Sequence, residues 1–218
     1  MKKKTIIIIL VAILIVAIIT GVVCFFVFKG NNNTQEEQGY EISKLQKIYD
    51  NMKEKDVFTF SLTMNDNDKE VYAVNGETGY VDIYDEGEHT TNIVKDGNTY
   101  LLVYDTQKYY TYQNNTMILE KITERFEDIL SRAFSTGKEK INNKEYKYEE
   151  FSEYSNFLMN YDKNLNEDTA VTRFYFDGDK LVYIKTIYDG KEELLKVDIT
   201  YDKGNTNLYN IPSNFTEG

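Results

Sequence analysis

Residues 57–64 read VFTFSLTM, and this alternating stretch decides the fold that the sequence predicts. Successive side chains of a β-strand point to opposite faces, so the apolar residues share one face and the polar residues share the other. The apolar face carries Phe58, Phe60, Leu62 and Met64. The pattern predicts a half-buried strand in a sheet that packs one face against an apolar core.

Toward the C-terminus, short β-rich segments up to Gln113 are separated by turn-forming residues. The turns are Asp66-Asn67-Asp68, Asn75-Gly76, Glu86-Gly87, Asp96-Gly97-Asn98 and Asp105-Thr106-Gln107. Glycine and asparagine tolerate the positive φ that tight hairpins need. The last third repeats the pattern, with predicted strands at 170–176, 181–188 and 193–201 and a final strand at 208–211. The first three of these strands are linked by the predicted turns Asp177-Gly178-Asp179-Lys180 and Asp189-Gly190-Lys191-Glu192. We therefore expect antiparallel meanders in which consecutive strands are neighbours.

Two stretches change the period of the apolar residues from two to between three and four. Residues 41–54 form one apolar stripe, which predicts an amphipathic helix before the first strand. A second helix is predicted over 116–136, with Gly137 just beyond its C-terminus, and a short third helix around 154–161. The order of elements predicts an α+β fold, in which a curled antiparallel sheet, or open half-barrel, is packed on its concave face by helices.

The N-terminal segment Thr5–Phe28 contains 24 consecutive uncharged residues and follows a short leader with three lysines. A helix of that length is about 36 Å long, enough to cross a bilayer core of about 30 Å. The lysines favour a cytoplasmic N-terminus. A transmembrane signal-anchor is the leading interpretation, and a cleaved secretory signal or a lipoprotein signal ending at Cys24 are the alternatives.

This segment sets the predicted domain organisation and location. Residues 1–29 would be the cytoplasmic leader and transmembrane anchor, 30–39 a polar tether, and 40–218 one extracytoplasmic domain. The protein would then be a single-pass protein of the cytoplasmic membrane, with its N-terminus inside.

Composition excludes some classes of partner for the domain at 40–218. It holds 21 basic and 34 acidic residues, so its net charge is −13, a sign that repels nucleic-acid phosphates. Cys24 is the only cysteine of the chain, so this domain has no disulfide and no thiolate nucleophile.

The sequence offers no candidate catalytic, cofactor-binding or metal-binding residue, and we expect a protein that is not an enzyme. His89, the only histidine, lies in a turn-like stretch and is interpreted as exposed. Glu149 and Glu150 are interpreted as a solvated edge, because adjacent strand residues point to opposite faces and cannot share acid–base work. The stretch that begins at Asp66 resembles a calcium loop only in part, because its sixth position is Val71 rather than glycine.

A set of four segments over about residues 41–215 gives the chain a family resemblance. They are the leading helix before Val57–Phe60, the stretch Val94–Leu102, the stretch Tyr146–Phe151 and the closing Tyr209–Ser213. In these patterns the chain resembles the LolA/LppX superfamily of bacterial lipoprotein-localisation and lipid-binding lipoproteins. The resemblance implies an open, curled half-barrel plugged by helices, with a hydrophobic cavity that holds the acyl chains of a lipid or lipoprotein.

The residues expected to line such a cavity are inferred from the faces of the first strand and the second helix. They are Phe58, Phe60, Leu62, Met64, Ile122, Phe126, Ile129 and Leu130. A close-packed core uses the same residue types, so two interpretations stay open. In the first, a membrane-anchored domain binds or hands off an acyl-chain ligand. In the second, the domain is a non-enzymatic cell-surface interaction or sensory module with a solid core.

Overall fold

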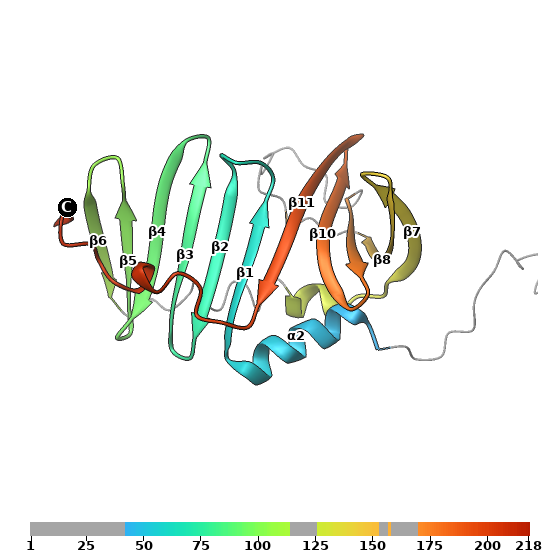
Figure 1. The fold of residues 1–218 in the computed structure, drawn as a ribbon, viewed down its shortest axis with the longest axis horizontal. Helices are drawn as coiled ribbons and strands as arrows, with labels where there is room; N and C mark the ends of the chain where they lie inside the picture. Colours follow the sequence, from blue (N-terminus) through green and yellow to red (C-terminus); the bar gives the residue numbers. More distant parts are fainter. Residues whose placement is uncertain (1–41, 114–125, 153–156, 158–169) are drawn as a thin grey trace, which may run out of the picture. The chain divides into compact units, whose positions relative to one another are not determined.

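A computed structural model describes residues 42–113, 126–152, 157 and 170–218 of the chain. The chain divides into two compact units, Met1–Glu41 and Ile42–Gly218, and every described residue belongs to the second unit. This unit is built on a twelve-stranded sheet, shown in Figure 1.

One helix and six strands make up the first part of this unit. They are α2 (Lys44–Lys55), β1 (Val57–Thr63), β2 (Lys69–Asn75), β3 (Thr78–Asp85), β4 (Glu88–Lys95), β5 (Asn98–Val103) and β6 (Lys108–Gln113). The second part contains β7 (Ser135–Ile141), β8 (Lys144–Ser152), β9 (Val171–Asp177), β10 (Lys180–Tyr188), β11 (Lys191–Thr200), the 3₁₀ helix η2 (Thr206–Tyr209) and β12 (Thr216–Glu217). Residues 126–130 are also helical.

The strand order across the sheet is β12-β6-β5-β4-β3-β2-β1-β11-β10-β9-β8-β7. Strands β1 to β6 form one antiparallel meander and β7 to β11 form a second. The two meanders join where β1 pairs antiparallel with β11, from Thr59 opposite Thr200 to Thr63 opposite Lys196. Strand β12 differs from the rest because it pairs parallel to β6.

Tight hairpins connect many neighbouring strands, and several use residue pairs in which both members have positive φ. Predicted turns of this kind are Glu86-Gly87, Asp96-Gly97 and Asp189-Gly190, with φ between 47° and 93°. The β7–β8 turn has the same backbone signature at Asn142-Asn143, which was not predicted. Two consecutive positive φ values match the right-handed twist of the flanking strands, so these turns favour hairpins.

Helix α2 packs one apolar stripe against the sheet. The Ser43 hydroxyl accepts a hydrogen bond from the Gln46 backbone N–H at 3.2 Å and so caps the helix. Its buried residues, Leu45, Ile48, Tyr49 and Met52, have the three- and four-residue spacing of a single helix face. They join the main apolar core with residues of β1 and β8–β11 and with the helical residues 126–130.

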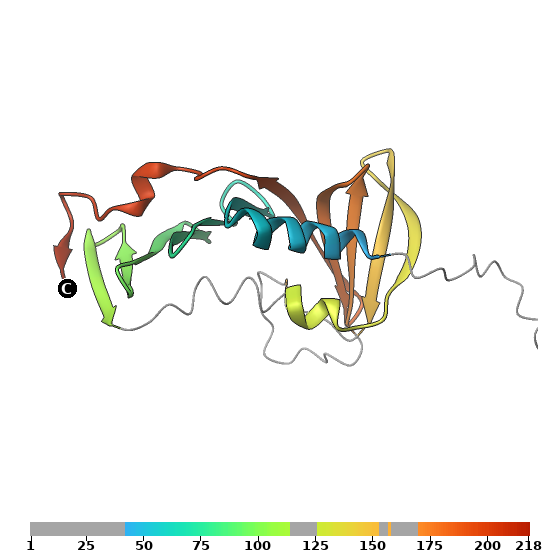
Figure 2. The same ribbon diagram turned by 90° about the horizontal axis from the view of Figure 1, so that it is seen from below.

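The other face of the sheet is crossed by the C-terminal segment 202–215. Val81 in β3 belongs to the main core, and its neighbour Tyr80 faces the opposite side of the sheet. The Tyr80 hydroxyl accepts a hydrogen bond from the Asn205 backbone N–H at 2.9 Å, and its ring packs edge-on against Tyr209 at 5.2 Å. Further along, Phe215 closes a smaller apolar cluster on β4 and β5. In Figure 2 this segment runs along the sheet toward β6.

The expected α+β class is wrong, because the described unit is mainly β. Its sheet has twelve strands, while α2, η2 and residues 126–130 are short helices. Part of the stretch predicted as a helix over 116–136 is a strand, since β7 begins at Ser135. Gly137 lies inside β7 rather than after a helix. A Cβ atom there would lie 2.4 Å from Cζ of Tyr148, so glycine makes room for that ring.

Other predicted elements differ or lie elsewhere. The strand predicted at 208–211 is replaced by η2, and the last strand is β12. Residues 116–125 of the second predicted helix lie outside the described residues, and so does most of the third predicted helix at 154–161.

The predicted membrane helix is not supported by the structure. In the part of the chain that it describes, no helix is long and apolar enough to cross a membrane. Helix α2 has 12 residues, which gives a length of about 18 Å. The segment Thr5–Phe28 lies outside the described residues, as do the predicted divisions at 29 and 39. The predictions of a signal-anchor and of a single-pass location in the cytoplasmic membrane are therefore not supported.

Candidate functional site

The residues predicted to line a ligand cavity meet in one apolar cluster. Its buried members are Phe58, Phe60, Leu62, Phe126 and Ile129, and its partly buried members are Met64 and Leu130. The eighth predicted residue, Ile122, lies outside the described residues. The alternation of β1 and the helical spacing of 126–130 thus direct these side chains into the same layer.

Aromatic rings fill the centre of this cluster. Phe126 is 0% exposed. Its ring centroid lies 5.7 Å from that of Phe60 on β1, 5.5 Å from that of Phe157 and 6.2 Å from that of Tyr49 on α2. These separations fall in the range of about 4.5–7 Å for packed aromatic pairs. The sheet and the elements that cover it are therefore in direct ring contact at this point.

The ring packing continues toward β8 and β9. Phe157 packs edge-on against Phe174 at 5.4 Å, and Phe174 packs edge-on against Phe151 at 5.7 Å. All three side chains are at most 1% exposed. One connected set of rings therefore joins β1, residues 126–130 and β9.

A buried carboxylate attaches the start of α2 to the sheet. Glu149 on β8 is 5% exposed. It accepts hydrogen bonds from the Ser43 hydroxyl and the Lys44 backbone N–H, both at 2.6 Å, and from the Leu45 backbone N–H at 3.2 Å. The first N–H groups of a helix lack partners within the helix, and a negative charge is favourable there. The interpretation of Glu149 as a solvated edge residue is therefore wrong, although Glu150 does point to the opposite face, where it contacts Arg173.

The middle of α2 is also connected to residues 126–130. The Tyr49 hydroxyl donates a hydrogen bond to Glu127, and Lys53 Nζ lies 3.8 Å from the same carboxylate. Burial and the Glu127 carboxylate raise the pKa of Tyr49, so the phenol stays protonated and acts as a donor.

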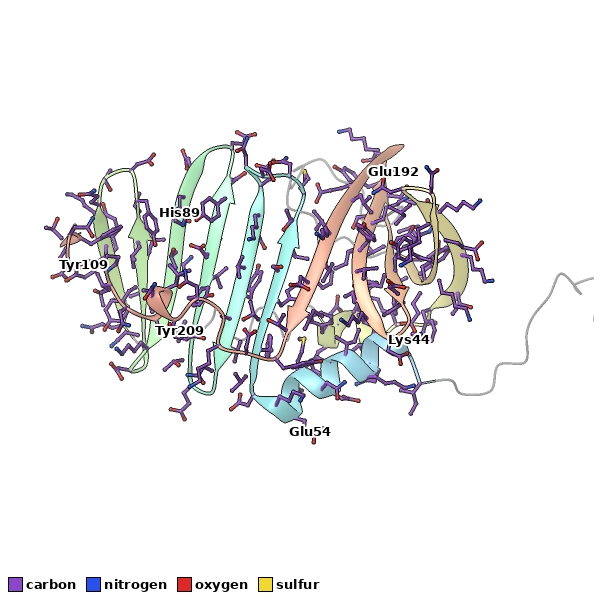
Figure 3. All side chains as sticks on the ribbon, in the orientation of Figure 1. Lys44, Glu54, His89, Tyr109, Glu192 and Tyr209 are labelled. Carbon is purple, nitrogen blue, oxygen red and sulfur yellow. The ribbon has the colours of Figure 1, made fainter. Side chains whose placement is uncertain are left out.

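His89 forms a site that the sequence analysis did not predict. Figure 3 shows it on β4. Its imidazole lies flat between two tyrosine rings, with centroids 4.1 Å from Tyr84 and 3.7 Å from Tyr104 and interplanar angles of 12° and 9°. The interpretation of His89 as an exposed turn residue is wrong, because only 21% of its side chain is exposed.

A buried aspartate holds the His89 ring. Asp82 on β3 is 6% exposed. Its Oδ1 atom lies 2.8 Å from His89 Nε2 and accepts a hydrogen bond from the Thr91 hydroxyl at 2.6 Å. Burial, together with Asp82 and Tyr104, raises the pKa of Tyr84, which keeps this neighbouring phenol neutral. The cluster therefore satisfies a buried negative charge with two side chains of β4.

Within the described residues, this cluster is an aspartate–histidine pair in which the His89 side chain is hydrogen-bonded to Asp82 and not to a hydroxyl. A general base activates a nucleophile that is within hydrogen-bond reach of its ring. The Thr91 hydroxyl, which shares Asp82 with His89, donates its hydrogen bond to Asp82. In the described ranges, no group of three or more histidine, cysteine, aspartate or glutamate side chains could hold a metal ion.

A second charged cluster joins β7 to β9 and β10. Glu139 lies 2.5 Å from Lys185 Nζ and 2.8 Å from Arg173 Nη1, and it accepts a hydrogen bond from the Tyr175 hydroxyl at 2.6 Å. Three strand spacings separate β7 from β10, about 14 Å in a flat sheet. Figure 2 shows that the sheet curls at this end, and the long Glu139 and Lys185 side chains make the contact across it.

The protonation of Glu139 is set by these partners. Burial alone would raise its pKa, but the hydrogen bonds from Lys185, Tyr175 and Arg173, with the charge of Lys185, lower the pKa of Glu139 to about 2. The carboxylate is therefore charged at neutral pH and holds the curled end of the sheet.

Comparisons with known proteins find similarity among solved structures. No family model matches the chain, and no curated protein matches it. Among solved structures, the chain is similar to an uncharacterized conserved protein from Thermus thermophilus, with a TM-score of 0.45 and 9% sequence identity. The match covers 81% of this chain and 99% of that chain. A similarity of this extent carries no argument about fold or function.

Proposed function

We propose that residues 42–218 form a non-enzymatic interaction module with a solid core, which recognises a macromolecular partner through its surface. The observation that supports this proposal is the packing around Phe126. Pockets for small molecules enclose about 300–1,000 Å³ of open volume. Here Phe126 instead contacts rings of the sheet and of α2, where an acyl chain would have to lie.

The state of the polar clusters also supports a role without catalysis. Asp82 and His89 bind each other between two tyrosine rings, and the Glu139 carboxylate is held by Lys185 and Arg173. Groups that are already paired with protein partners favour a structural role over acid–base work on a substrate.

The second candidate is the acyl-chain carrier that the LolA/LppX resemblance implies. One observation favours it, because the predicted lining residues gather in a single cluster between β1 and the elements that cover it. In this candidate the rings of Phe126 and Phe157 would have to move apart to admit an acyl chain.

Fluorescence quenching can separate these two candidates, because the chain contains no tryptophan. The full-length Phe126→Trp variant would place one reporter inside the ring cluster. Tyr201→Trp is the matched control at a side chain that is 42% exposed. If the core is solid, fatty acids brominated on the acyl chain will not quench the reporter at position 126, and acrylamide will quench only the control. Saturable quenching at position 126 by the brominated fatty acid would overturn the proposal and support the carrier.

A further inference from the structure

The two ends of the sheet differ in how their edges are protected against further strand pairing. An exposed strand edge presents unpaired backbone groups, and charged side chains usually discourage pairing there. β7 carries three consecutive charged residues, Lys138 to Lys140. β6 reads KYYTYQ and has no charge after Lys108. From Tyr109 to Gln113, the β6 edge therefore lacks protection by charged side chains.

Strand β12 covers only the beginning of this edge. It pairs with Lys108 and Tyr109, and the Gly218 N–H donates to the Tyr109 carbonyl at 3.0 Å. The backbone groups of Tyr109 therefore point away from β5. Because these directions alternate along a strand, the backbone groups of Thr111 and Gln113 also point outward. Within the described part of the chain, β6 pairs beyond Tyr109 only with β5.

The side chains of this edge strand are exposed and aromatic. Tyr110 is 39% exposed and Tyr112 is 47% exposed, and both lie on the same face of β6. Figure 3 labels the adjacent Tyr109 beside β12. Aromatic pairs across neighbouring strands are favourable, so these rings add to the pairing capacity of the backbone.

We infer that this edge pairs with the same edge of a second copy of the chain, antiparallel and about a two-fold axis at Tyr112. The pairing continues the edge on which β12 already adds a strand, and β12 confines it to Thr111–Gln113. Only the register about Tyr112 sets Thr111 of each copy opposite Gln113 of the other. In this register the outward-pointing backbone groups of Thr111 and Gln113 in both copies exchange hydrogen bonds. It also places the two Tyr112 side chains directly opposite each other.

The charge of the chain gives this contact a distinct salt dependence. Each copy has a formal net charge of −11, so two copies repel each other at long range. The paired residues, Thr111 to Gln113, are uncharged. Added salt therefore strengthens this dimer, whereas it would weaken the binding of a basic partner. This inference does not depend on whether the core is solid. Whether the dimer forms therefore does not change the interpretation of the quenching experiment.

Disulfide trapping in the full-length chain tests the register. The variant Tyr112→Cys in a Cys24→Ser background carries a single thiol. Opposite residues at this kind of position have Cα atoms about 4.5 Å apart, and disulfides span about 4.4–6.8 Å. Tyr110→Cys is the control, because the two copies of that position would be about 14 Å apart along the strands. We expect mild oxidation to give a covalent dimer of Tyr112→Cys in higher yield than of Tyr110→Cys, and more of it at high salt.

A further substitution guards against a result caused by contacts elsewhere in the chain. Thr111→Pro, added to Tyr112→Cys, removes an outward N–H that the β5 ladder does not use. We expect it to abolish trapping while circular dichroism shows an intact sheet. Equal trapping of the two thiol variants, no trapping of either, or trapping that Thr111→Pro leaves unchanged would each overturn the inference.

Discussion

Glu149 is expected to be one of the main determinants of the stability of this domain, because it connects α2 to β8. Its carboxylate accepts three hydrogen bonds, two of them from N–H groups in the first turn of the helix. Hydrogen bonds to a charged group contribute about 1.5–3 kcal/mol each, and a buried donor left without a partner costs about 1–3 kcal/mol. Contributions within one cluster are not additive. We expect Glu149→Ala to lower the free energy of unfolding by about 3–5 kcal/mol.

Glu149→Gln is the more informative variant, because it keeps the shape and one acceptor oxygen but removes the charge. We expect this variant to lower the free energy of unfolding by about 1–2 kcal/mol. This is the size of the favourable interaction between a carboxylate and a helix N-terminus together with the weakening of the hydrogen bonds. Urea unfolding at neutral pH, followed by circular dichroism, measures both losses. Hydrogen exchange should also become faster in α2.

Glu145→Gln is the matched control for this prediction. Glu145 lies on the same strand, but its carboxylate forms an exposed pair with Lys138 at 3.6 Å. Its loss should change stability by less than about 0.5 kcal/mol. If Glu149→Ala and Glu145→Gln have equal effects, or if α2 exchanges no faster in Glu149→Ala, the reasoning that α2 depends on this carboxylate is refuted.

Three other contacts give further predictions. Gly204→Ala should destabilise the domain by about 2 kcal/mol or more, because Gly204 has φ of 60° and a Cβ atom there would lie 2.6 Å from the Tyr80 hydroxyl oxygen. Urea unfolding measures this change, and an unchanged unfolding midpoint would contradict the prediction. Glu139 has a pKa of about 2 in the folded state, below its usual 4.5, so its contribution is complete above about pH 5 and disappears as the pH falls toward 2. After discounting for its exposure, this contribution is at most about 2 kcal/mol, and Glu139→Gln should unfold with a weaker dependence on acid. His89→Phe should keep the ring stack but leave the Asp82 carboxylate with one donor fewer, which should lower the free energy of unfolding by about 1–3 kcal/mol. Adding Asp82→Asn to His89→Phe should restore part of this stability. If the double variant is no more stable than His89→Phe, the Asp82–His89 interaction does not stabilise the domain.

The local features of this fold could be predicted from the sequence because their causes are local. The alternation of 57–64 places Phe58, Phe60 and Leu62 on the buried face of β1, as expected. The Glu86-Gly87 and Asp96-Gly97 pairs form the hairpins that their positive φ values allow. The stripe over 41–54 forms α2, although the helix begins at Lys44.

Two larger features could not be obtained in this way. The pairing of β1 with β11 depends on packing between distant segments, and neither strand carries a sequence signal for it. The helix predicted up to Thr136 was wrong at its end because Phe134 fits a helical stripe equally well. Only the position of the Tyr148 ring shows why Gly137 is needed in a strand.

The His89 site was missed, although part of it could have been found. The Glu86-Gly87 hairpin was predicted, and counting outward from this two-residue turn places Tyr84 opposite His89 and Asp82 opposite Thr91. The third ring, Tyr104, comes from the residue directly after β5, beyond the hairpin. The resemblance to LolA/LppX proteins gave no indication of this site, because it concerned the opposite face of the sheet.

The pairing of β1 with β11 has a consequence for how the protein is made. Thr63 is opposite Lys196 and Thr59 is opposite Thr200. More than half of the chain is therefore synthesised after β1 before β11, the second strand that pairs with β1, is made. At about 5–20 residues per second, this delay is about 7–28 s on the ribosome. During that time one edge of β1, with Phe58 and Phe60, is open to solvent or to chaperones. The central strand of the finished sheet is thus the earliest strand made and among the last to be completed.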